Sequence, residues 1–278
     1  MPFKVILAVT GPDVPDPRLD LAVSLCQDAE AHLAVLATAV AAPPPIGRYA
    51  AEISDAWHEE RRAEIANLQK FAAELREKLA QKDVSSDIST IYEEEGWVDD
   101  VIGQRAKYTD LVLLGPDLLA HPLMKEKVVE GALFRAGKPL LVIPEGARPT
   151  LKPKRILVAW NARIEASKAV SAAIELLAGA ESVHVALVDP EQGERDHGFE
   201  PGADIATYLA KHGAKVTVDR LPSQGRPVED ILRQHAVDVA ADMLVMGAYG
   251  HSRMRQRIFG GVTRSMLDNP PLPVFLAR

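Results

Sequence analysis

The chain has 278 residues, of which 47% are hydrophobic, and a formal net charge of −7 at pH 7. This length suits one large domain or two of ordinary size, and the acidic balance argues against a nucleic-acid partner, which needs clustered Lys and Arg. The single cysteine, Cys26, excludes an internal disulfide and fits a reducing compartment. No signal-peptide pattern or membrane-length apolar stretch is found, so we expect a cytoplasmic protein without membrane contacts.

The first half of the chain alternates short apolar runs with amphipathic stretches. Runs rich in Val, Ile and Leu predict strands that are buried on both faces, and apolar residues at helical spacing predict surface helices. The expected strands are residues 3–9, 31–38, 84–92, 111–114 and 139–144, and the expected helices are residues 19–26, 51–81, 98–106 and 124–136. Strands that alternate with helices predict a parallel, doubly wound sheet.

The second half repeats this pattern after a linker at residues 145–153. Three of its runs resemble runs of the first half in the same order, which indicates a tandem duplication: residues 154–160, 241–247 and 272–276 match residues 3–9, 109–115 and 138–142. Further strands are expected at 183–189 and 214–219, and helices at 162–178, 201–212 and 227–238. The predicted fold class is α/β, with two tandem five-stranded parallel doubly wound (Rossmann-like) domains at residues 1–146 and 154–278.

Glycines mark the end of the apolar run at residues 243–246 and the start of the next helical pattern. Gly247, Gly250 and Gly260 follow the spacing Gly-x2-Gly-x9-Gly, and Gly261 comes directly after. Glycine lets the backbone turn tightly and leaves no Cβ in the way of an anion, while a helix N-terminus presents N–H groups. The loop therefore predicts a phosphate-binding cradle.

This spacing resembles the nucleotide loop of the universal stress protein family, and the tandem halves resemble its two-domain members. The resemblance implies a five-stranded parallel α/β fold and, as in ATP-binding members, phosphates on this loop with adenine near the ends of the first two strands. ATP is then the first candidate ligand, with the presence of Mg²⁺ left open. The implied cofactor-binding residues are Ala159, Trp160, Asn161, Val188, Met246, Gly247, Ala248, Gly250, His251, Arg253, Gly260, Gly261, Val262 and Thr263.

Two positions depart from the family pattern. The family's ATP loop usually has Ser or Thr after the last glycine, where this chain has Gly261, with Thr263 two residues further on. Asn161 stands where many members have Asp, and its amide forms hydrogen bonds without a charge. A hydroxyl ligand is therefore expected to be missing or displaced.

The predicted crevice depends on strand order. If the first and fourth strands of the second half are neighbours, residues 159–161 and 246–247 face each other beyond the carboxyl ends of the strands. Val188 and Asp189 would then form the other wall.

The first half lacks a matching cradle. Aligning the final strands places residues 126–127, Glu and Lys, opposite Gly260 and Gly261, and residues 116–118 follow Gly115 without a second glycine. A carboxylate and side-chain bulk would repel a triphosphate, so one nucleotide site per chain is predicted. The first half then serves mainly as a structural partner.

Simpler explanations stay open for several of these residues. Gly247 and Gly260 could merely end a strand and cap a helix, and Trp160 and Tyr249 could pack instead of stacking on adenine. Four arginines near the glycines could neutralise phosphate or be solvated: Arg253, Arg255, Arg257 and Arg264.

Other chemistry has little sequence support. The acidic runs at residues 93–95 and 99–100 are predicted to be solvated. No metal site is predicted, because the eight histidines and one cysteine show no ligand spacing. No residue is predicted to be catalytic.

The resemblance implies a stress-response regulatory protein whose C-terminal half binds an adenine nucleotide. The alternatives are slow ATP hydrolysis, and a nucleotide-free structural or interaction module. The resemblance also implies that the final strands, residues 139–143 and 272–276, pair edge to edge, which would join the halves as a pseudo-dimer or two chains as a dimer.

Overall fold

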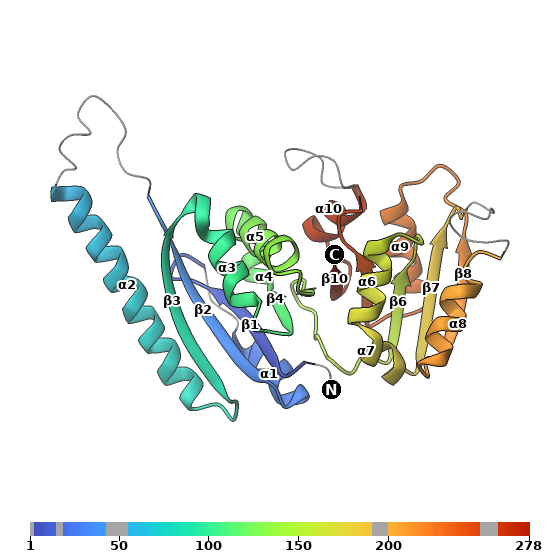
Figure 1. The fold of residues 1–278 in the computed structure, drawn as a ribbon, viewed down its shortest axis with the longest axis horizontal. Helices are drawn as coiled ribbons and strands as arrows, with labels where there is room; N and C mark the ends of the chain where they lie inside the picture. Colours follow the sequence, from blue (N-terminus) through green and yellow to red (C-terminus); the bar gives the residue numbers. More distant parts are fainter. Residues whose placement is uncertain (1–2, 15–18, 43–54, 191–199, 251–260) are drawn as a thin grey trace. The chain divides into compact units, whose positions relative to one another are not determined.

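The computed structural model describes residues 3–14, 19–42, 55–190, 200–250 and 261–278. The chain forms two compact units, residues 3–136 and 137–278. In each unit helices alternate with mainly parallel strands (Figure 1). The predicted α/β class is confirmed.

The sheet of the N-terminal unit has the order β3-β2-β1-β4, and these strands are parallel. Its strands are β1 (Val5–Thr10), β2 (His32–Ala41), β3 (Ser86–Glu94) and β4 (Leu111–Leu114). Its helices are α1 (Leu19–Ala29), α2 (Asp55–Ala80), η1 (Glu95–Trp97), α3 (Val98–Ala106), α4 (Pro116–Leu119), α5 (Pro122–Val129) and η2 (Glu130–Ala136).

The C-terminal unit has the strand order β5-β10-β9-β6-β7-β8. Its strands are β5 (Leu140–Val142), β6 (Arg155–Ala159), β7 (Ser182–Val188), β8 (Val216–Leu221), β9 (Met243–Gly247) and β10 (Val274–Ala277). Its helices are α6 (Ile164–Ala172), α7 (Ile174–Gly179), α8 (Ala203–Lys211), α9 (Val228–Asp238) and α10 (Gly261–Asp268). The strands are parallel, except that β5 runs antiparallel to β10.

The pairing of β5 with β10 confirms that the two final strands of the repeated halves lie edge to edge within one chain. Leu141 pairs with Phe275 at the centre of this contact, and both side chains are fully buried. Self-association of two chains stays a prediction.

Both units join their first and fourth strands through one carboxylate at matching positions of the repeat. In the N-terminal unit, the N–H groups of residues 4–5 donate to Asp110 Oδ2 over 2.7 and 3.0 Å. In the C-terminal unit, those of residues 154–155 donate to Asp242 Oδ2 over 2.9 and 2.8 Å. Each Asp therefore fixes the start of one strand against the start of its neighbour.

Some predicted helices are divided in the structure. The helix expected at residues 124–136 begins as α5 and continues as the π-helical η2. Here η2 packs closely on α3, because a Cβ on Gly131 would lie 2.7 Å from Ile102 Cγ2. The helix expected at 162–178 is divided into α6 and α7 at Ala173.

The prediction that Asp99 is solvated is wrong. Its side chain is only 4% exposed and contacts Lys127 Nζ at 3.2 Å and Arg135 Nη2 at 2.8 Å. Burial alone would raise the pKa of Asp99, but the hydrogen bonds from Arg135 and Lys127 outweigh it and hold the pKa below its usual range. Asp99 is therefore a buried, charged link between α3, α5 and η2.

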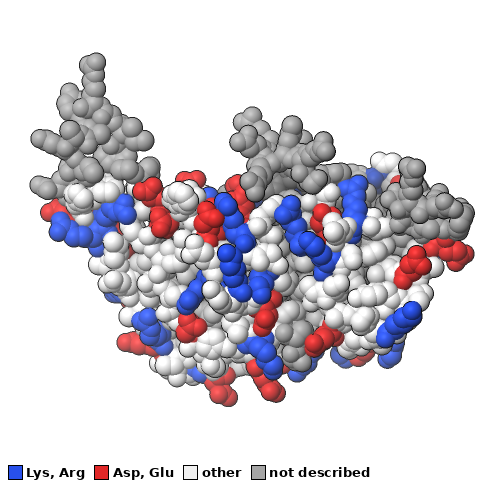
Figure 2. Space-filling model, viewed as in Figure 1, with Lys and Arg blue, Asp and Glu red and all other residues white. Residues whose placement is uncertain are grey.

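Charges of both signs lie on the viewed face of each unit. Figure 2 shows Lys and Arg interspersed with Asp and Glu on the viewed face, which fits the modest net charge of −7. No helix in the described parts of the chain is both long and apolar enough to span a bilayer.

Candidate functional site

The candidate site lies at the carboxyl ends of the central strands of the C-terminal unit. Strand β6 lies between β9 and β7, with Ala159 paired to Met246 on one side and to Ala186 on the other. The first and fourth strands of this half are therefore neighbours, which is the condition for the predicted crevice. Because the chain moves outward from β6 through β7 to β8 and returns at β9, the strand order reverses between β6 and β9.

Polar groups line one side of this strand edge. Asn161 is exposed, and its Oδ1 accepts a hydrogen bond from Arg163 N over 3.2 Å. Asp189, directly after β7, accepts from Ser223 N over 2.9 Å. Hydrogen bonds from the Ser223 side chain and backbone lower the pKa of Asp189, so this carboxylate is charged at neutral pH. Trp160 and Val188 are partly buried beside them.

Gly247 is required by packing. A Cβ at this position would lie 2.5 Å from both Ala166 N and Glu165 C, at the start of α6. The neighbouring side chains of Met246 and Ala248 are buried, so these two residues can offer a ligand only their backbone. The structure thus supports the simpler explanation for Gly247, a close approach of helix to strand.

The loop after β9 is connected to α10 by a hydroxyl. Tyr249 is buried and has a left-handed backbone, with φ of 61°. Its N–H donates to Thr263 Oγ1 over 3.4 Å, and Thr263 is itself only 5% exposed. The Thr263 hydroxyl therefore holds the start of the loop at Tyr249, while its role as a phosphate ligand stays a prediction.

Gly261 is the glycine of this loop that has free space around it. It is the exposed first residue of α10, and a Cβ there would find no atom within 4 Å. Val262 follows, partly buried, in the same turn. N–H groups in the first turn of a helix have no intrahelical acceptor and favour anions, so this turn is the described element best suited to a phosphate.

Two residues near the loop were missed by sequence reasoning. Arg163 Nη1 lies 3.5 Å from the carbonyl oxygen of Gly250, and a Cβ on Gly250 would lie 3.4 Å from Glu165 Oε2. A guanidinium and a carboxylate from the start of α6 therefore flank the second glycine. Their only sequence signal is that they follow Asn161 by two and four residues; glycine spacing carries no information about them.

Three other candidates, His251, Arg253 and Gly260, lie outside the described residues, as do Arg255 and Arg257. Arg264 is exposed on α10, and its Nε lies 3.4 Å from Asp268 Oδ2.

The N-terminal unit differs at the matching place. Gly115 leads directly from β4 into α4, with Pro116 at the first helical position. The Lys127 ammonium is engaged by buried Asp99. The prediction that this unit binds no nucleotide stays a prediction.

Among the described residues, one group could hold a metal ion, formed by His184, Asp219 and His235. It was not anticipated, because its members are 35 and 16 residues apart and come from three elements. His184 lies four residues before the end of β7, so the group is not part of the strand-end site.

Known proteins support the resemblance. The model of the universal stress protein family matches residues 152–278. A universal stress protein of Synechocystis sp. is 30% identical over 149 residues; the match covers 51% of this chain and 47% of that protein, so the chain spans about half the length of this curated relative.

Two solved structures share the fold over nearly the whole chain. One is a universal stress protein of Archaeoglobus fulgidus, which is 15% identical and has a TM-score of 0.64. The superposition covers 98% of this chain and 96% of that protein. The other is a functionally unknown protein of Pseudomonas aeruginosa, which is 18% identical and has a TM-score of 0.57. That superposition covers 99% of this chain and 92% of the other protein.

Proposed function

We propose that the C-terminal unit, whose residues 152–278 match the model of the universal stress protein family, binds one adenine nucleotide per chain, with ATP as the first candidate, in a stress-response role. Binding would change the surface that this unit offers to a partner. The protein is then a ligand-responsive binder.

One observation carries this proposal: the ends of β6 and β9 are neighbours, and the exposed N-terminal turn of α10 begins at Gly261. Trp160, Asn161 and Val188 would lie toward the nucleoside, and the Gly250 backbone and the first turn of α10 toward the phosphates. Because Gly261 carries no hydroxyl at the position where the family usually has Ser or Thr, the phosphates would rest mainly on backbone groups, and the affinity is expected to be modest.

The open space at Gly261 allows a sharp test by calorimetry with ATP. Gly261→Ser supplies a hydroxyl without a clash, and a hydrogen bond to a charged oxygen corresponds to roughly a tenfold gain in affinity. Gly261→Ala adds the same Cβ without the hydroxyl and is the matched control, with nearly unchanged affinity.

A second variant addresses the electrostatics of the loop. Glu165→Gln keeps the side-chain shape but removes the carboxylate beside Gly250, so the affinity for ATP should rise. The wild-type chain should bind one equivalent of ATP. No binding of ATP, ADP or AMP by the wild type and by Gly261→Ser would disprove the proposal.

A further inference from the structure

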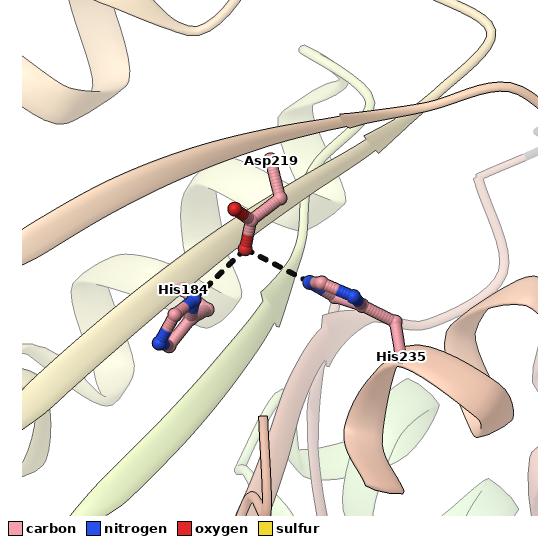
Figure 3. A group of neighbouring side chains, drawn as sticks. All are labelled: His184, Asp219 and His235. Atoms are coloured by element: carbon pink, nitrogen blue, oxygen red, sulfur yellow. Dashed lines mark hydrogen bonds and ion pairs between the residues drawn. The ribbon is translucent and has the colours of Figure 1, made fainter. Parts of the chain in front are cut away.

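His184, Asp219 and His235 converge in the C-terminal unit from three elements, β7, β8 and α9 (Figure 3). His184 Nδ1 and His235 Nε2 each lie 2.8 Å from the same oxygen, Asp219 Oδ2. The side chains are 22%, 14% and 20% exposed, in the order His184, His235, Asp219. They form a largely buried group that solvent can still reach.

Strand register and helix periodicity bring these side chains to one face of the sheet. Asp219 pairs with Ala186, and His184 precedes Ala186 by two residues, so His184 and Asp219 point to the same side. On α9, His235 follows the buried residues Ile231 and Leu232 by four and three positions. His235 therefore lies on the helix face that covers the sheet.

The donor atoms have the composition of a transition-metal site. The ligand atoms of all three residues lie within 4.8 Å of one another. Two imidazole nitrogens and one carboxylate oxygen, with a water in the fourth position, form a common Zn²⁺ donor set, with ligand distances of about 2.0–2.2 Å. We propose that His184, Asp219 and His235 bind one divalent first-row transition-metal ion, for which Zn²⁺ is the test ion.

The matching position of the N-terminal unit carries a different set of side chains. Arg105 is the eighth residue of α3, as His235 is the eighth of α9. Arg105 Nη2 lies 3.2 Å from Asp87 Oδ2, while His32 Nε2 lies 2.8 Å from Asp87 Oδ1. A guanidinium does not lose its proton in proteins and cannot ligate a metal, so this group is an ion-pair cluster and the metal site belongs to the C-terminal unit alone.

A bound ion would link the edge strand β8 to both β7 and α9. It would thereby stabilise this side of the sheet, because metal binding to the folded state adds to the free energy of unfolding. The site does not depend on the proposed nucleotide, since none of its residues lies at the strand ends.

The test uses the untagged full chain, freed of metal with a chelator and titrated with Zn²⁺ by calorimetry. The wild type should bind one Zn²⁺ per chain, and the thermal unfolding midpoint should rise by roughly 5–10 °C at free Zn²⁺ a hundred times the Kd. Co²⁺ in place of Zn²⁺ should give the visible absorption bands of four-coordinate cobalt.

His235→Arg is the matched variant, because it copies the arrangement of Arg105 with Asp87 and keeps an ion pair to Asp219. It should retain the native circular dichroism but bind Zn²⁺ more than about tenfold more weakly and lose the cobalt bands. Asp219→Asn should do the same while keeping the side-chain shape. His32→Gln changes the other imidazole–carboxylate pair and should leave Zn²⁺ binding unaltered.

Absence of Zn²⁺ binding by the wild type would overturn the proposal, and the group would then be a hydrogen-bonded network only. Wild-type affinity in folded His235→Arg and Asp219→Asn would do so as well, because the ion would then bind elsewhere.

Discussion

Asp99 shows how neighbouring residues decide the charge of a buried side chain. It contacts Lys127 and Arg135, which lie 28 and 36 residues further along the chain. Removing either cation would leave the buried negative charge of Asp99 only partly compensated, which destabilises the fold. Asp99 thus anchors the packing of α3 against η2.

The lowered pKa of Asp99 predicts a specific acid sensitivity. A carboxylate whose pKa is lower in the folded state contributes stability that is complete above the unfolded value, about pH 4, and lost as the pH falls through the folded pKa. Urea unfolding should therefore show that wild-type stability declines more steeply below about pH 4 than that of Asp99→Asn. Equal acid dependence in the two proteins would contradict this assignment.

The single thiol is expected to be inert. Burial raises the pKa of Cys26 to about 12, and its side chain is fully buried in α1. Since the thiolate is the reactive form, a chromogenic disulfide reagent at pH 8 should react with the chain only after urea is added. Rapid reaction of the native protein would show that α1 opens readily.

Two glycines of the loop have different physical roles. Gly247→Ala should destabilise the protein by about 1–3 kcal/mol in urea unfolding, because its Cβ meets backbone atoms of α6 at 2.5 Å. Gly261→Ala meets no atom within 4 Å and should leave the stability nearly unchanged. Similar losses in both variants would indicate that Gly261 is also required for packing.

At the scale of elements, the carboxylate that joins first and fourth strands occurs in both units. Asp110→Ala and Asp242→Ala each remove the acceptor of two backbone N–H groups. We expect each substitution to cost about 1 kcal/mol, the typical net contribution of an intramolecular hydrogen bond, because water can hydrate the freed N–H groups. Measurement by urea unfolding should give comparable losses. Asp238→Ala, at an exposed helix end, is a suitable control with a smaller effect.

The local sequence predicts a helix or strand correctly where the spacing of its apolar residues fits only one of the two. The Val- and Leu-rich runs of β1, β4, β6 and β9 are strands with largely buried side chains, as predicted. The π-helical η2 was not predicted; it includes Gly131, whose close approach to Ile102 of α3 joins residues that are distant in the sequence. The short α4 was missed because Pro116 at its first turn has the composition of a loop.

Part of the candidate site was likewise predictable from the sequence, and part depends on contacts between distant segments. Glycine spacing and strand order identify the strand edge, but the contacts of Arg163 and Glu165 with Gly250 join segments 85 or more residues apart. The group around Asp219 is likewise assembled from residues that no local pattern connects. Side chains that meet only through the fold cannot be read from spacing.

At the scale of the whole molecule, the compact units and the sequence repeat end at different residues. The repeat places β5 in the first half, whereas residues 137–278 form the second compact unit and include β5. The reason is the antiparallel pairing of β5 with β10, which adds a strand to the C-terminal sheet.

The pairing of β5 with β10 affects how truncated fragments of the chain behave. A fragment that begins at Lys154 lacks β5, and the backbone N–H and C=O groups of β10 that β5 engages are then exposed at a sheet edge. Exposed apolar edges recruit other strands and promote aggregation. A dimer or aggregate of such a fragment would therefore be a product of the truncation.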